Sequence, residues 1–125
     1  MEEVKSPAKE LEHFLAVVDE ITREYKLAYS TVNEEDRRLQ DLLHALEFAE
    51  DKAERNRMAT QLQRSRRLRR RNKDMVKRCE QIVKFFEVQN NRAVLNQMRQ
   101  LLGRQRKEEG YLDGERTYTP RVGKG

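Results

Sequence analysis

The residues best able to bind a partner form a basic run between positions 64 and 73. If the run is helical, Arg64, Arg67 and Arg71 share one stripe while the other cations cover the remaining faces. No side is then apolar, which argues against a membrane-surface helix. Seven of the ten residues are basic, and we predict that they and Arg78 form the binding site: Arg64, Arg66, Arg67, Arg69, Arg70, Arg71, Lys73 and Arg78.

Three interpretations of this run stay open. The chain holds 18 Arg and 9 Lys, and guanidinium groups favour forked contacts with carboxylates, so our first prediction is contact with a protein or nucleoprotein partner. Direct binding of DNA or RNA through phosphate neutralisation is the second. No aromatic platform lies nearby for stacking on single strands. The third is a solvated helix whose charges pair with an acidic N-terminal half.

The other reactive side chains do not form a recognisable catalytic or metal site. Glu10-x-x-His13 and Asp41-x-x-His44 have the spacing of di-iron bundle ligands, but the heptad phase turns them outward. Cys79 falls on an apolar seam and is predicted to be a buried structural thiol. No Gly-rich phosphate loop is present. We therefore expect no cofactor, no bound metal and no enzymatic activity.

Composition excludes several classes of protein. Leu, Ile, Val and Phe make up 28 of 125 residues, just above the roughly 20% level at which disorder is expected. One cysteine allows no internal disulfide. No apolar run approaches the ~18 residues of a membrane span, and no signal peptide opens the chain. We expect a soluble cytoplasmic protein, in the host cell if it is phage-encoded.

The net charge of +5 conceals two halves of opposite sign. Residues 1–50 carry 13 acids and 6 bases, whereas residues 51–125 carry 9 acids and 21 bases. This asymmetry favours nucleic acid, an acidic partner surface or self-association.

Three helices must position the basic run, over residues 7–31, 33–88 and 92–109. Ser6-Pro7 begins the first, and Thr31-x-x-Glu34 has capping-box spacing and indicates a second start. Sevenfold spacing also runs across that signal, so one long helix is the alternative. The first helix has apolar residues at spacings of 3 and 4: Leu11, Phe14, Val18, Ile21, Tyr25, Ala28 and Val32.

The chain beyond these helices is predicted to be a tail. Residues 110–125 contain Gly110, Gly114 and Pro120 and are expected to be extended or disordered. We predict that this tail docks on a partner as an extended strand, through Tyr111, Tyr118 and Arg121.

The fold class expected from these elements is all-α. Residues 1–109 should form one helical domain, an antiparallel hairpin or slender three-helix bundle with a long arginine-rich helix. The small apolar fraction favours a dimeric coiled coil, because a lone thin bundle buries little area.

Two segments resemble small helical accessory proteins of phages and prophages of Gram-positive bacteria. These are residues 69–74 with the apolar helix after them, and residues 116–122 near the end, within the last 60 or so residues. The resemblance implies a phage or mobile-element accessory factor that binds and inhibits or modulates a host defence, transcription or replication protein. The alternatives are a direct DNA- or RNA-binding regulator and a structural coiled-coil scaffold.

Overall fold

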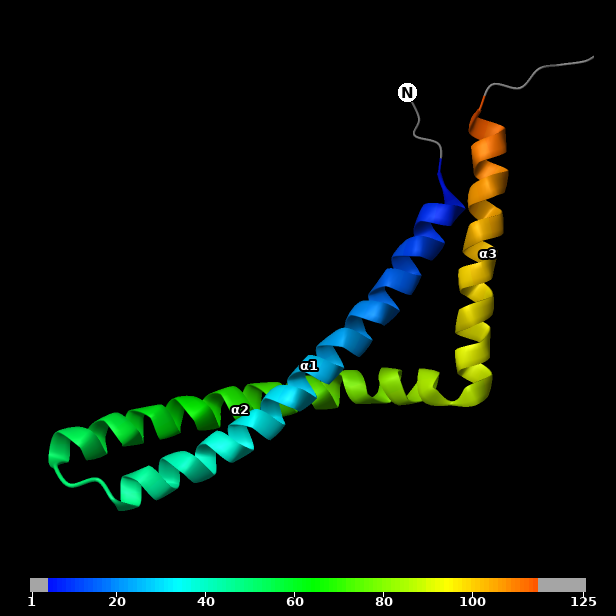
Figure 1. Cartoon of the computed structure of the whole chain (residues 1–125). Coiled ribbons are helices and arrows are strands. Elements are labelled where there is room, and N and C mark those ends of the chain that lie inside the picture. Colours follow the sequence, from blue (N-terminus) through cyan, green and yellow to red (C-terminus); the bar gives the residue numbers. More distant parts are fainter. Residues whose placement is uncertain (1–4, 115–125) are drawn as a thin grey trace, which may run out of the picture. The chain divides into compact units, whose positions relative to one another are not determined.

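The computed structural model describes residues 5–114, and the regular structure in this range is entirely helical. Helix α1 spans Pro7–Glu47, α2 spans Lys52–Glu87 and α3 spans Gln89–Asp113 (Figure 1). The prediction of an all-α fold is confirmed. Within the described range, no helix combines the length and the apolar character needed to cross a lipid bilayer.

The chain divides into two compact units. Among the described residues, unit 1 combines α1 up to Val17 with the segment from Val88 onward, which is α3. Unit 2 comprises Val18–Glu87, the rest of α1 with α2. The sequence predicted one domain over residues 1–109. The two units were not predicted, because a heptad repeat does not show at which residue a long helix changes its packing partner.

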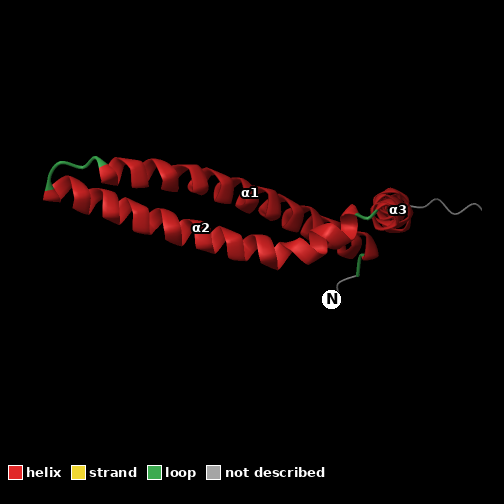
Figure 2. Ribbon diagram, turned by 90° about the horizontal axis from the view of Figure 1, so that it is seen from below, coloured by secondary structure: helices red, strands yellow, loops and turns green. Residues whose placement is uncertain are grey.

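Unit 2 is an antiparallel pair of helices (Figure 2). The predicted break in the first helix near residues 31–33 is wrong, since α1 continues to Glu47. A capping box contributes only about 1 kcal/mol. A break there would cost more, because Leu39 and the following seam residues of α1 would lose their packing against α2. Ala28 is buried before that point and Glu35 after it, so the seam runs straight through.

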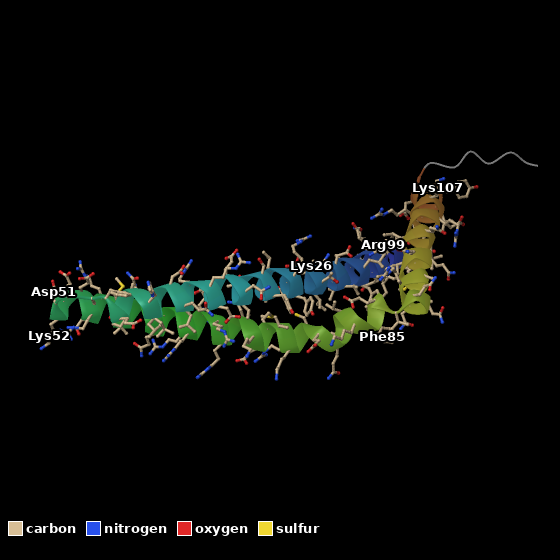
Figure 3. All side chains as sticks on the ribbon, turned by 60° about the horizontal axis from the view of Figure 1, so that its bottom comes forward. Lys26, Asp51, Lys52, Phe85, Arg99 and Lys107 are labelled. Carbon is tan, nitrogen blue, oxygen red and sulfur yellow. The ribbon has the colours of Figure 1, made fainter. Side chains whose placement is uncertain are left out.

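The actual turn lies between Glu47 and Lys52. The Asp51 Oδ1 atom accepts a hydrogen bond of 2.7 Å from the Glu54 backbone N–H, which caps the start of α2. Figure 3 labels Asp51 and Lys52 at this turn. Asp51-x-x-Glu54 is therefore the local sequence signal that marks the start of the second helix.

The seam of α2 also continues without interruption through the basic run. Its inward positions recur at spacings of 4 and 3 from Met58 to Phe86, but three consecutive ones are polar: Ser65, Arg69 and Asn72. The seam therefore continues through this stretch, with polar side chains at its inward positions instead of apolar ones. Cys79 and Val83 are the buried apolar residues that follow.

A buried polar layer joins the two helices of unit 2 at Glu35. This side chain is 2% exposed, and its Oε2 atom accepts a 2.6 Å hydrogen bond from the Ser65 hydroxyl. Its Oε1 atom lies 3.1 Å from a guanidinium nitrogen of Arg38. One residue further on, Asp36 forms an ion pair with Arg69 of α2. A buried carboxylate requires such partners, and we expect this layer to favour one register of α2 against α1.

Unit 1 pairs the start of α1 with α3. Helix α3 is longer than the predicted 92–109, because it already begins at Gln89. Val88 alone, with an extended backbone (φ −62°, ψ 129°), separates α3 from α2. Its end also differs from prediction, since Gly110 is helical and accepts a 3.0 Å hydrogen bond from the Gly114 backbone N–H.

The carboxylate of Glu109 caps the N-terminus of α1 from a position far along the chain. It accepts a hydrogen bond from the Ser6 hydroxyl and one of 2.7 Å from the Ala8 backbone N–H. Gln105 donates a third, of 3.1 Å. The Ser6 hydrogen bond is the main cause that lowers the pKa of Glu109. An anion at this end of a helix also interacts favourably with the macrodipole.

Glu109→Gln is expected to destabilise the protein at pH 7 and to have a smaller effect near pH 3. Because folding lowers the pKa of Glu109, its stabilisation is complete above the unfolded-state pKa of about 4.3. It is lost as the pH falls through that value and then through the lower pKa of the folded state. Thermal melts of both proteins between these pH values measure the difference in Tm. A Tm difference that is unchanged at pH 3 would contradict the charged cap.

The apolar seam at the start of α1 also differs from prediction at one position. Leu15 is the buried residue, at 5% exposure, while Phe14 is 44% exposed. The spacing from Leu11 permits either residue, because positions three and four ahead share a helix face. The packing partner, α3, decides between them.

Candidate binding surface on α2

The structure places the predicted binding cations on α2 in two different environments. Arg69 is half-buried on the seam and paired with Asp36. Arg69 therefore contacts α1, and it also lines a hollow together with Arg66, Arg70 and Lys73. The other seven are exposed: Arg64, Arg66, Arg67, Arg70, Arg71, Lys73 and Arg78.

The exposed cations form two stripes, one on each side of the polar seam. The first basic flank consists of Arg66, Arg70, Lys73 and Lys77, at spacings of 4, 3 and 4. The second basic flank consists of Arg64, Arg67, Arg71 and Arg78, at spacings of 3, 4 and 7. A rotation of about 100° per residue places the two stripes on separate sides of α2.

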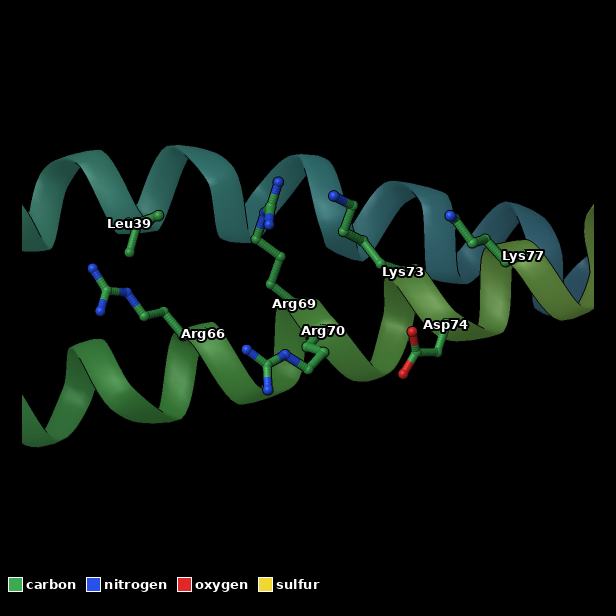
Figure 4. A pocket seen from close by; sticks show the side chains of 7 residues that line it. All are labelled: Leu39, Arg66, Arg69, Arg70, Lys73, Asp74 and Lys77. Carbon is green, nitrogen blue, oxygen red and sulfur yellow. The ribbon is translucent and has the colours of Figure 1, made fainter.

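The first basic flank lines an open hollow of about 420 Å³ beside α1. Figure 4 shows Arg66, Lys73 and Lys77 extending along the side of α2 nearer to α1. Leu39 of α1 gives this hollow an apolar wall, and Asp74 is the one acid that lines it. The arrangement suits an anionic group that carries some apolar surface.

A second hollow, of about 330 Å³, lies beside Arg64, the first residue of the second basic flank. Arg38 of α1 and Arg64 of α2 line it together with two leucines, Leu42 and Leu68. Leu68 is 37% exposed. Cations beside leucine side chains therefore recur on both sides of the hairpin.

The acidic residues of α1 leave both flanks electrically uncompensated. Within residues 5–114, Arg69 is the one cation of the basic run that forms an ion pair. Asp36 and Glu35, two acids of α1 that contact α2, are engaged by Arg69 and by Ser65. Like charges three and four residues apart destabilise a helix by a few tenths of a kcal/mol per pair. The two flanks thus carry a repulsion that a bound anion would relieve.

The candidate metal ligands and the cysteine lie where the sequence predicted. Glu10, His13, Asp41 and His44 are all exposed. Within the described residues, no group of three His, Cys, Asp or Glu side chains could hold a metal ion. Cys79 is 5% exposed, and burial, with a smaller contribution from Glu24, raises the pKa of its thiol. A raised pKa disfavours the nucleophilic thiolate.

At Tyr111, the structure differs from the predicted extended tail. Tyr111 belongs to the last turns of α3 rather than to an extended strand, and it is 64% exposed. Tyr118 and Arg121 lie outside the described residues.

Sequence reasoning missed several residues that line the hollows, among them Lys77, Leu39 and Arg38. Lys77 continues the stripe of Lys73 by one helical turn, a signal that the 3–4 spacing already contains. Leu39 and Arg38 are supplied by α1, and only the pairing of the helices brings them to the basic run. Comparisons of this chain with protein-family models, with curated proteins and with solved structures find no match.

Proposed function

We propose that this chain is a non-enzymatic interaction protein whose unit 2 binds an acidic surface of a protein or nucleoprotein that handles nucleic acid. By occupying that surface it inhibits or modulates the partner, as expected of a phage or mobile-element accessory factor. The observation that carries the proposal is the pair of basic flanks, which are exposed and lack ion-pair partners among residues 5–114.

Two features favour an acidic protein surface over bare phosphates. Arginine dominates the flanks, and its planar fork matches carboxylates in bidentate geometry. Leu39, Leu42 and Leu68 line the hollows beside the cations. Apolar contacts of this kind suit a protein surface, where aliphatic side chains accompany carboxylates, better than they suit a sugar–phosphate backbone.

Direct binding of DNA or RNA is the second candidate. It is favoured by the presence of cations on both sides of the seam over residues 64–78, a length of roughly 21 Å at 1.5 Å per residue. Such a helix has enough charge to neutralise several phosphates. In this case the affinity would depend steeply on salt.

Capture by the tagged chain from a lysate of its source cells, with and without nuclease, distinguishes the two candidates. Our proposal expects the same protein to be captured in both lysates. The purified complex should then lose much less than 1,000-fold in affinity between 50 and 200 mM salt, whereas about six phosphate contacts would give a loss of roughly that size. Capture that disappears after nuclease treatment supports direct nucleic-acid binding. Absence of any captured macromolecule contradicts both functions.

A further inference from the structure

The two hollows of unit 2 differ in the cations that line them. The first hollow, of about 420 Å³, has three arginines and the two lysines Lys73 and Lys77. The cations of the second hollow are Arg38 and Arg64. A lysine ammonium binds phosphate as a point charge, whereas the planar fork of arginine matches phosphates and carboxylates alike. The first hollow is therefore better suited to a ligand that carries phosphate groups.

The first hollow also has an excess of positive charge that the protein does not neutralise. Asp74 is the one acid among its lining residues, and Arg69 is engaged by Asp36. The other four cations have no ion-pair partner among residues 5–114: Arg66, Arg70, Lys73 and Lys77. Together they can neutralise a ligand with several negative charges.

The pairing of α1 with α2 brings a tyrosine to one end of this hollow. Tyr29 precedes Asp36 by seven residues, and Val76 follows Arg69 by seven. Seven residues are two turns of a heptad repeat. Because Asp36 is paired with Arg69 across the antiparallel helices, Tyr29 lies opposite Val76, which is the stretch of α2 between the two lysines of the hollow. The basic run has no aromatic neighbour in the sequence, and α1 supplies one.

The ring of Tyr29 is available for stacking. Its side chain is 53% exposed, and its ring centroid lies 6.0 Å from that of Tyr25. This contact supports the ring from one side and leaves part of its surface open to solvent. An exposed aromatic ring beside cations is the arrangement with which proteins bind a nucleobase and its phosphates. Leu39 adds an apolar wall further along the hollow.

The cationic stretch ends on both sides, which limits the length of the ligand. Toward the start of α2, the positions one heptad before the two arginines of the first basic flank are Ala59 and Gln63. Toward its end, the positions one heptad after the two lysines are Glu80 and Lys84, which pair with each other at 2.7 Å. From position 66 to position 77 the flank extends roughly 17 Å at 1.5 Å per residue. The hollow itself is within the usual size range of small-molecule sites, about 300–1,000 Å³.

We propose that the first hollow binds a free nucleotide that carries a chain of phosphates, of the nucleoside triphosphate class. The base stacks on Tyr29, and the phosphates extend from Lys73 along Arg70 to Arg66. A single strand of nucleic acid would continue beyond both ends of the cationic stretch, so a short ligand fits the site better. This inference goes beyond the proposed function and does not depend on it, because the purified chain alone should bind the nucleotide.

Titration calorimetry of the purified full chain with ATP and with inorganic tripolyphosphate tests the site. ATP should bind with a Kd of about 10–100 μM. Tyr29→Ala should weaken ATP binding about five- to tenfold and leave tripolyphosphate binding unchanged, because it removes the stacking surface and no charge. Tyr29→Phe should bind ATP as the wild-type protein does, since the ring is kept.

A matched pair of double variants tests the phosphate contacts. Arg66→Gln/Arg70→Gln removes two cations of the first basic flank and should weaken both ligands about tenfold. Arg67→Gln/Arg71→Gln removes two cations of the second basic flank with the same spacing, and both affinities should stay within about twofold of wild type. Equal losses in the two variants would show that general attraction of anions, rather than this hollow, binds the probes.

The remaining outcomes separate a free nucleotide from a strand and from no ligand. A short single-stranded oligonucleotide should bind no more tightly than ATP. If it binds more tightly, with the same dependence on Tyr29, a strand is the ligand and our assignment is wrong. Absence of ATP binding, or ATP binding that Tyr29→Ala does not weaken, would also overturn it. None of these results decides the acidic-partner proposal, which capture from the lysate tests separately.

Discussion

Ser65→Ala should lower the free energy of unfolding by about 1–3 kcal/mol, although it removes a single oxygen atom. Glu35 is 2% exposed, and the Ser65 hydroxyl is its donor from α2, at 2.6 Å. Without that donor, one carboxylate oxygen in the seam between two helices loses its hydrogen-bond partner on α2. Urea denaturation followed by circular dichroism measures the loss.

Glu35→Leu should cost much less than Ser65→Ala, or should stabilise the hairpin. It replaces a charge at a seam position with an apolar side chain, and such replacements are often neutral or favourable. The freed Ser65 hydroxyl can bond to a carbonyl one turn earlier in its own helix. The variant should instead weaken the choice of register, which increased exchange of the backbone amides of α1 and α2 would reveal.

Ser30→Ala provides the control for both seam variants, because Ser30 is on α1 and exposed. Its effect should stay within about 0.5 kcal/mol. If Ser65→Ala costs no more than this control, the polar layer does not stabilise the pairing. If Glu35→Leu is the more damaging change, the carboxylate contributes through Arg38 rather than through Ser65.

Reversing three exposed charges should abolish partner binding without unfolding the helices. In Arg66→Glu/Arg67→Glu/Arg70→Glu, both basic flanks lose cations that have no ion-pair partner among residues 5–114. We expect affinity for the acidic partner to fall about 100-fold or more. The Tm should be unchanged or slightly higher, because repulsion along α2 is relieved.

The matched control reverses three exposed charges elsewhere in unit 2. Lys26→Glu/Arg37→Glu/Lys52→Glu changes the net charge by the same amount but leaves both flanks intact. Binding isotherms with the captured partner should be nearly those of the wild-type protein. Equal loss in both triple variants would show that net charge alone attracts the partner. Unchanged binding by the flank variant would contradict the proposed surface, and loss of helicity would favour the scaffold function.

Much of the fold could be predicted from local features of the sequence. From residue 8 to residue 102 there is no Gly or Pro, and strong helix formers dominate. The helical character of the chain, the antiparallel pairing in unit 2 and the burial of Cys79 follow from these features and from the 3–4 spacing. The wrong break near residue 32 arose because one local signal was given more weight than a repeat that spans it.

The candidate site could be predicted less completely, and for a specific reason. The basic run is visible in the sequence, and Arg69 falls on the 3–4 spacing that runs along α2 from Met58 to Phe86. Its ion pair is not visible in the sequence, because it depends on the position of Asp36 on the opposing helix. Leu39 and Arg38 reach the hollows for the same reason, through pairing between residues about 30 positions apart.

The sequence by itself determined that this chain is helical and that its cations concentrate on one helix, because helix propensity and stripe spacing are properties of neighbouring residues. The tertiary structure alone decided three other features: Glu35 is buried, Leu15 rather than Phe14 packs inward, and Glu109 caps α1. Each of these depends on a contact between distant segments. A local preference of about 1 kcal/mol decides such a position only when packing leaves the alternatives nearly equal in free energy.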